Sequence, residues 1–318
     1  MDIGIEIKNL TKKFNGLTAV DHINLEIRRG HLFSLLGPNG AGKSTTINIL
    51  ATVLKPTKGC VSILGYDLKT QSNKIRELIG VCPQETVMYD NLSARENIEL
   101  IAKMHKLHPK DYKERVDDLL GKMNLLDRAN DLVRKYSGGM KRRVNVLMAV
   151  VHSPEVIFFD EPSAGLDPQS RRIVWDFIKD FEKEKKTIIL TTHNMEEADD
   201  LSEELAIIDH GKIIAQGTPQ ELKSKNGKGD IIEFRVNSEK IKDRESIVQE
   251  LALHPDVIWA KPLGKERICF NAFDGLRKIS GFYDWLKSSS NITMRDLVIR
   301  QNTLEDVFID LTGRELRD

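Results

Sequence analysis

A glycine-rich segment near the N-terminus has the residue types and the spacing of a phosphate-binding loop. It matches the pattern G-x-x-x-x-G-K-[S/T] with the residues Gly37-Pro38-Asn39-Gly40-Ala41-Gly42-Lys43-Ser44. Glycines let successive backbone N–H groups point inward around a triphosphate, and the N-terminus of a following helix adds positive potential. Lys43 would neutralise the β and γ oxygens, and Ser44 would ligate Mg²⁺. An apolar run, 31–36, precedes the loop and a helical pattern follows it, which is the context that such a site requires.

Two consecutive acidic residues close a short apolar run in the middle of the chain. The run Val156 to Phe159 predicts a buried strand, and Asp160 and Glu161 follow it directly. Asp160 suits the Mg²⁺ shell, through a bridging water, and Glu161 suits the orientation and activation of an attacking water. The alternative is a pair of ordinary solvated acids at a strand end. The phosphate-binding loop upstream favours nucleotide hydrolysis.

A Ser-Gly-Gly triplet stands between these motifs and precedes a helical run. Ser137-Gly138-Gly139 begins 23 residues before Asp160. In this position the triplet resembles the signature motif of the ATP-binding cassette (ABC) ATPases. Other segments follow the order of that family and are similar to its Q-loop, D-loop and switch histidine, namely Gln84, Ser163-Ala164-Gly165-Leu166-Asp167 and His193. The resemblance covers residues 3 to about 223.

The resemblance implies a role for each of these residues, with ATP and Mg²⁺ as the cofactors. The catalytic residues that it implies are Glu161, His193, Gln84 and Lys43, and the Mg²⁺ site that it implies is Ser44, Gln84 and Asp160. Phe14 stands where the family has an aromatic ring that stacks on adenine, and core packing is the alternative for this ring. The residues implied to bind nucleotide are Phe14, Gly37, Pro38, Asn39, Gly40, Ala41, Gly42, Lys43, Ser44, Thr45, Ser137, Gly138, Gly139 and Asp167.

Departures from the commonest family pattern indicate a branch of the family. The signature usually begins with Leu and ends in Gln, whereas this chain has Tyr136 and Met140, followed by Lys141-Arg142-Arg143. This version resembles the drug-resistance and nodulation-type exporter ATPases that serve ABC-2 type permeases. The segments 302–308 and 311–313, Asn-Thr-Leu-Glu-Asp-Val-Phe and Leu-Thr-Gly, are similar to the end of those subunits.

The hydrophobic pattern predicts an α/β fold. Alternating apolar residues at Ile3 to Ile7 and at Ile23 to Ile27 predict half-buried strands. Apolar strands at 156–159 and 187–190, separated by a helix over 168–184, predict a mostly parallel sheet covered on both faces. The resemblance implies the P-loop NTPase cassette, a RecA-like core with an antiparallel β subdomain and a helical insert. The pattern from Ser72 to about Val151 is largely helical, with starts at Ser93 and Pro109, and a hairpin is expected at 204–216.

A second domain is expected after residue 224. The segment 225–229 has two glycines and no apolar residue, which is typical of a linker. Beyond it the order of predicted elements is β-α-β-β-α-β, the split βαβ or ferredoxin-like arrangement. The predicted domains are therefore a nucleotide-binding domain over 1–224, with its helical part at about 85–152, and a C-terminal accessory α+β domain over 230–318.

Composition excludes several other classes of protein. The 318 residues carry 48 basic and 48 acidic side chains, which argues against a nucleic-acid binder. No apolar stretch approaches the roughly 18 residues that span a bilayer, and no secretory signal is expected. Cys60, Cys82 and Cys269 have no metal-site spacing and are expected to be reduced and mostly buried. His105 and His108 are expected to be solvated residues of a helix end, not metal ligands.

These features predict an ATPase subunit of an exporter. The resemblance implies a homodimer of cassettes closed by ATP, with a separate ABC-2 type transmembrane permease that docks on the segment 84–100. It also implies peripheral association with the cytoplasmic face of the cell membrane. The alternatives are a soluble ABC ATPase that acts on a ribosome or DNA, and an importer subunit. A kinase or GTPase would lack the signature triplet and the switch histidine.

Overall fold

The computed structural model describes residues 2–225, 229–236, 244–264, 266–290 and 294–313. Contacts divide the chain into two units, Met1–Pro219 and Gln220–Glu315. The predicted linker includes 226–228, which lie outside the described residues, so the boundaries at 224 and 230 stay predictions. Within the described ranges, no helix combines the length and the apolarity that a membrane span needs.

The first unit begins with an antiparallel sheet whose strands have the expected alternation. Its order is β2-β1-β4-β5, and its strands are β1 (Ile3–Phe14), β2 (Leu17–Arg28), β4 (Lys58–Ile63) and β5 (Tyr66–Asp67). In β2 the buried residues Ile23, Leu25 and Ile27 alternate with exposed ones. One face of this sheet therefore contributes to the hydrophobic core, which it shares with strands of the second sheet.

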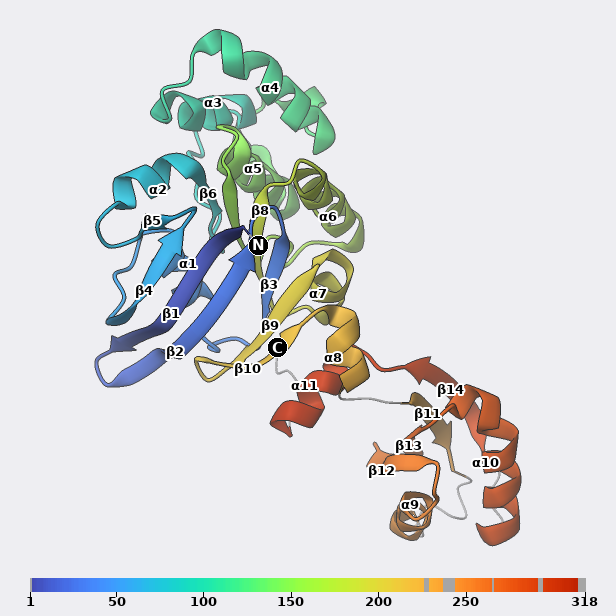
Figure 1. The fold of residues 1–318 in the computed structure, drawn as a ribbon. Coiled ribbons are helices and arrows are strands. Elements are labelled where there is room, and N and C mark those ends of the chain that lie inside the picture. The colour runs from blue at the N-terminus through green and yellow to red at the C-terminus, as the bar shows by residue number, and fades with distance from the viewer. Residues whose placement is uncertain (1, 226–228, 237–243, 265, 291–293, 314–318) are drawn as a thin grey trace. The chain divides into compact units, whose positions relative to one another are not determined.

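The second sheet of this unit positions the candidate chemistry. Its order is β10-β9-β3-β8-β7-β6, and its strands are β3 (Leu32–Leu36), β6 (Ile79–Cys82), β7 (Val156–Asp160), β8 (Thr187–Thr192), β9 (Glu204–Asp209) and β10 (Lys212–Gly217). All neighbours are parallel except β9 and β10, which form the expected hairpin. Every residue of β3, β7 and β8 is buried. The prediction of a mostly parallel sheet is confirmed, and Figure 1 shows its strands β3, β8, β9 and β10.

Strand β6 corrects one expectation. The sequence pattern was interpreted as largely helical over 72–151, but Ile79–Cys82 is an edge strand parallel to β7. Gly80 lies against helix α5 (Gly138–Val150), where a Cβ would stand 2.0 Å from the carbonyl oxygen of Ala149. The strand has four residues, too few for an alternating pattern to distinguish it from a buried helical segment.

The helices of this unit include those expected after Ser93, at Pro109 and at 168, which begin where the sequence indicates. The helices are α1 (Lys43–Leu50), α2 (Ser72–Leu78), α3 (Ala94–Met104), α4 (Pro109–Lys122), α5, α6 (Pro168–Lys183) and α7 (Met195–Leu201), with short 3₁₀ turns at Leu126–Arg128 and Val133–Lys135. Helix α8 (Pro219–Lys225) begins at the last residue of this unit, and the rest of it belongs to the second unit. Ser93 forms a capping box with Glu96 at the start of α3. His108 caps α4, whose first residue is Pro109.

The second unit has the predicted split βαβ arrangement. Its order along the chain is β11 (Asp230–Arg235), α9 (Arg244–Ala252), β12 (Val257–Leu263), β13 (Arg267–Ala272), α10 (Gly275–Ser290) and β14 (Arg295–Gln301). The antiparallel sheet has the order β12-β13-β11-β14, and a helix α11 (Leu304–Thr312) follows. Residues of the sheet and of helices α9 and α10 form a separate core.

The cysteines and histidines singled out in the sequence have structural surroundings. All three thiols are free; Cys82 and Cys269 are buried, but Cys60 is exposed. The ring of His105 stacks on His152, with 3.6 Å between ring centroids. Among the described residues no group of His, Cys, Asp and Glu is arranged to hold a metal ion by itself.

We expect residues 1–224 to fold and to bind nucleotide without the rest of the chain. The first unit, Met1–Pro219, has its own cores, and a cut after residue 224 leaves that unit whole together with all of α8 but its last residue. The measurement is the melting temperature of the 1–224 fragment with and without ATP. A fragment that is insoluble, or whose melting temperature does not respond to ATP, would place the boundary elsewhere.

Candidate active site

The phosphate-binding loop joins β3 to α1, as the sequence predicts. Gly42, at the N-cap of α1, has φ 105°, a left-handed conformation that favours glycine. A Cβ there would stand 2.4 Å from the carbonyl oxygen of Ala19 on β2. The loop is therefore held against the antiparallel sheet by a contact that a side chain would prevent, and the first N–H groups of α1 face away from the helix.

Lys43 is buried at the start of α1, with 4% of its surface exposed. Its ammonium Nζ donates to the carbonyl oxygens of Gly37 at 2.7 Å and Pro38 at 3.1 Å, and it lies 3.2 Å from Oε1 of Glu161. Burial lowers the pKa of Lys43, and the charge of Glu161 opposes that shift. A buried cation at this loop can neutralise the oxygens of a bound phosphate.

Asp160, the last residue of β7, joins the loop to the sheet. Its Oδ1 accepts hydrogen bonds from Ser44 Oγ at 3.1 Å and from the hydroxyl of Thr191 on β8. Ser44 and Asp160 thus place a hydroxyl and a carboxylate oxygen side by side. Oxygen donors of this kind fit Mg²⁺, directly or through water.

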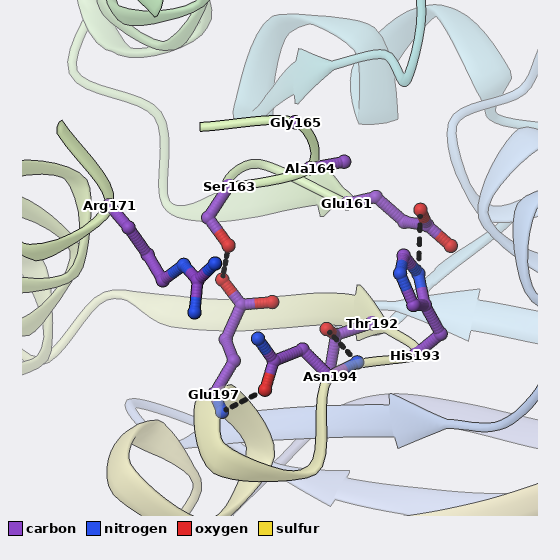
Figure 2. A pocket seen from close by; sticks show the side chains of 9 residues that line it. All are labelled: Glu161, Ser163, Ala164, Gly165, Arg171, Thr192, His193, Asn194 and Glu197. Carbon is purple, nitrogen blue, oxygen red and sulfur yellow. Dashed lines mark hydrogen bonds and ion pairs between the residues drawn. The ribbon is translucent and has the colours of Figure 1, made fainter. Parts of the chain in front are cut away.

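Glu161 follows β7 and lies between Lys43 and His193. Its second oxygen, Oε2, is 3.0 Å from Nδ1 of His193, which follows β8 (Figure 2). The backbone of Glu161 has φ 50°, and its N–H donates to the carbonyl and hydroxyl oxygens of Thr191 at 3.0 and 3.1 Å. This conformation is uncommon for a residue with a side chain. It turns the carboxylate of Glu161 toward the loop.

Gln84 meets this cluster through its backbone. Its side chain is exposed, whereas its carbonyl oxygen accepts a 2.9 Å hydrogen bond from the guanidinium of Arg142 on α5. The same guanidinium donates to the carbonyl oxygens of Asp160 and Glu161, each at 2.7 Å. The structure therefore brings the Gln84 segment beside the end of β7, with Arg142 between them.

The Ser-Gly-Gly triplet forms the exposed start of α5. Ser137 is the N-cap, and its hydroxyl accepts from the N–H of Met140 at 3.2 Å. Gly138 has open space where a Cβ would lie. Tyr136 is buried before the triplet, and its hydroxyl donates to the carbonyl of Arg128 at 2.6 Å. Tyr136 therefore anchors the triplet, and the helix N-terminus is open to an anion.

The segment from Ser163 to Asp167 lies between Glu161 and α6. Asp167 is the exposed N-cap of α6 and accepts from Ser170 N–H at 3.0 Å. Ser163 Oγ donates to the buried carboxylate of Glu197 at 2.6 Å, and Figure 2 shows this pair beside Glu161 and His193. Burial raises the pKa of Glu197. One carboxylate on α7 thus holds the segment that leads from Glu161 to Asp167.

Phe14, at the end of β1, is 40% exposed. The ammonium of Lys12 lies 4.8 Å from the centre of its ring. The exposure excludes core packing as the main role of this ring and leaves a face for another planar group.

Three residues of this cluster were not predicted. They are Thr191, Arg142 and Glu197. Thr191 binds Asp160, Arg142 binds the carbonyls around Glu161, and Glu197 binds Ser163. The available signal for Thr191 was a polar residue at the end of an apolar strand, beside the predicted His193. Arg142 and Glu197 lie in polar helix sequences that do not distinguish them from surface residues.

Comparison with known proteins agrees with this geometry. A family model described as "ABC transporter" matches residues 20–164. The chain is 33% identical to the daunorubicin resistance ATP-binding protein DrrA3 of Streptomyces coeruleorubidus, over 99% of this chain and 98% of the relative. It is 33% identical to the linearmycin resistance ATP-binding protein LnrL of Bacillus subtilis, over 99% and 100%. It is also 33% identical to the Nod factor export ATP-binding protein I of Sinorhizobium fredii, over 100% and 88%.

Solved structures of similar fold are ATP-binding cassettes. An ATP-binding subunit of an ABC transporter has a TM-score of 0.64 and 28% identity, over 70% of this chain and 92% of that chain. The cassette MJ0796, in a dimeric post-hydrolysis state bound to ADP and Pi, has a TM-score of 0.63 and 28% identity, over 67% and 98%. The predicted cassette fold is confirmed.

We expect Glu161→Gln to keep ATP affinity and to lower turnover by about 100-fold or more, because the amide keeps the shape of the side chain but cannot take a proton from water. The measurements are steady-state phosphate release and equilibrium ATP binding. Glu155→Gln is the matched control. Glu155 directly precedes β7, at the end of the strand opposite to Glu161, and pairs with Lys186. Turnover of the Glu161 variant close to that of the Glu155 variant would contradict the role of Glu161.

Proposed function

We propose that this chain, which belongs to the ABC transporter family, powers export through a separate permease. It is an ATPase whose hydrolysis of ATP is coupled to transport. The observation that carries the direction of transport is the similarity to named drug-resistance and Nod factor export proteins over nearly the whole chain, the second unit included.

In the proposed mechanism Lys43 and the loop hold the phosphates of ATP, and Phe14 stacks on the adenine. Ser44 and Asp160 would hold Mg²⁺, which would supply charge neutralisation at the phosphate oxygens. Gln84 would be an additional Mg²⁺ ligand. Support comes from the oxygen pair of Ser44 and Asp160 and from the exposure of the Gln84 side chain.

Glu161 would orient and activate the attacking water, and His193 would position Glu161. In the structure, Glu161 is engaged by Lys43 at 3.2 Å and by His193 at 3.0 Å. A γ-phosphate competes with Glu161 for the ammonium of Lys43, so nucleotide binding would free one carboxylate oxygen of Glu161 for water. ATP binding would thereby free Glu161 to act as the general base.

The permease is proposed to be of the ABC-2 type and to dock on the segment 84–100. This segment has exposed apolar side chains, Val87 and Tyr89, with Tyr89 63% exposed. The backbone of Tyr89 is held by Asn97 of α3, which accepts from its N–H at 2.8 Å. An exposed aromatic ring on a fixed backbone is suited to an interface. The chain would thereby associate with the cytoplasmic face of the membrane.

We expect Tyr89→Asp to reduce membrane association several-fold without changing ATP hydrolysis by the purified chain, because the side chain is 63% exposed and takes part in none of the contacts described for the catalytic cluster. The measurement is the fraction of full-length chain that sediments with membranes of the producing cells. Val53→Asp is the control, since Val53 is 70% exposed but lies after α1. Equal sedimentation of both variants would reject this docking surface.

Two chains are proposed to share each active site. Ser137, Gly138 and Gly139 would contact the γ-phosphate held by the partner's loop, with the partner's D-loop Asp167 nearby. The exposed N-terminus of α5 supports this arrangement, as does the dimeric state of the related cassette MJ0796.

A mixture of two inactive variants tests the shared site. Lys43→Ala and Gly138→Asp chains should each fail to trap nucleotide as homodimers. A heterodimer should have one site in which both motifs are intact. The amount of nucleotide trapped per heterodimer should therefore reach about half of the amount trapped per wild-type dimer. Were the motifs to act within one chain, every site in the mixture would stay broken. Absence of trapping, with heterodimers confirmed by differently sized tags, would reject the shared site.

A further inference from the structure

Arg142 of helix α5 is a buried cation, with 4% of its surface exposed. Its Nε donates to the carbonyl of Pro162 at 2.9 Å. Its Nη1 donates to the carbonyls of Pro83 at 2.7 Å and Gln84 at 2.9 Å, and its Nη2 donates to those of Asp160 and Glu161. The guanidinium thus contacts five main-chain carbonyls from two segments that are far apart in sequence.

This set of acceptors distinguishes Arg142 from an arginine of an ion pair. A buried guanidinium requires acceptors for its N–H groups, and charge-assisted hydrogen bonds to carbonyls supply them. The five carbonyls in turn depend on this one side chain. Lysine has three donors on a single nitrogen, so it cannot reproduce a planar fork that reaches two loops at once.

Of the two segments that Arg142 holds, the segment 160–162 contains the strained backbone of Glu161. A residue with φ 50° keeps this conformation when surrounding contacts fix it on both sides. Thr191 accepts from the N–H of Glu161, and Arg142 donates to its carbonyl. The direction of the Glu161 carboxylate therefore depends on the two hydrogen-bonding partners together.

The other segment that Arg142 holds is 83–84, which contains Gln84. The side chain of Gln84 is exposed, so its position is set by the path of its backbone. Arg142 fixes that path through the carbonyls of Pro83 and Gln84, and Asn145, one turn further along α5, adds a 3.3 Å hydrogen bond to the Pro83 carbonyl. Helix α5 is therefore bonded to the Gln84 segment at two points.

We propose that Arg142 is a positioning residue that fixes the Gln84 segment and the backbone of Glu161 relative to the signature end of α5. This proposal rests on the roles proposed above for Glu161 and Gln84. Arg142 lies little more than one helical turn after Ser137, within one rigid helix. A partner nucleotide that contacts Ser137 thereby has a short covalent and hydrogen-bonded connection to the catalytic residues of this chain.

The test compares Arg142→Gln and Arg142→Lys in the full-length chain. We expect kcat for ATP hydrolysis to fall by about 10- to 100-fold in Arg142→Gln, with KM within about threefold of the wild type, because geometry is lost while the phosphate loop is kept. Arg142→Lys should be intermediate. Arg115→Gln is the matched control: Arg115 donates to the carbonyls of Val150 and Val151 at the other end of α5, and its loss should leave kcat within about twofold.

Amide hydrogen exchange supplies a readout that a general loss of stability would not produce. In Arg142→Lys, exchange should accelerate in peptides that cover 83–86 and 161–164 and stay unchanged in α3. An unchanged kcat in Arg142→Gln would overturn the proposal. So would faster exchange throughout the first unit, or an equal fall in kcat in Arg115→Gln. Wild-type turnover and its loss in Glu161→Gln are measured in the same series, so failure of the proposed function is distinguished from failure of this inference.

Discussion

The buried contact between Lys43 and Glu161 is the constraint on which the site depends. Opposite charges that are withdrawn from water are stable only when paired and hydrogen-bonded. Lys43 meets this requirement through two loop carbonyls, and Glu161 meets it through His193. The loop, β7 and β8 must therefore come together at the carboxyl ends of parallel strands. This is why Asp160, Glu161 and His193 lie at the carboxyl ends of β7 and β8, beside the loop that follows β3.

The parts of this arrangement that the sequence predicts are local. The loop, the acidic pair and the helix caps are each contiguous, and their chemistry requires particular residues at fixed spacing. The apolar strands and the split βαβ order of the second unit were predicted from composition and periodicity, and the structure has both. Strand β6 was missed because three apolar residues and one glycine are too few to show a period.

Contacts between distant segments could not be predicted in the same way. Arg142 binds main-chain carbonyls, and every residue has one, so no partner residue in the sequence indicates the contact. Thr191 and Glu197 bind through a hydroxyl and a carboxylate, whose partners depend on the order of strands in the sheet. The exposure of Cys60 likewise depends on its position in β4, in a sheet whose one face is covered.

The order of strands in the second sheet has a consequence for how the chain is made. Strand β3 lies between β8 and β9, whose residues follow it by more than 150 positions. On the ribosome, β3 and the phosphate loop are synthesised long before either neighbour exists. The antiparallel pair of β1 and β2 joins adjacent segments and can form early. A nascent chain that ends before β8 (Thr187–Thr192) therefore exposes both edges of an apolar strand, and one edge stays exposed until β9 (Glu204–Asp209) is made. In such a state chaperone binding competes with aggregation.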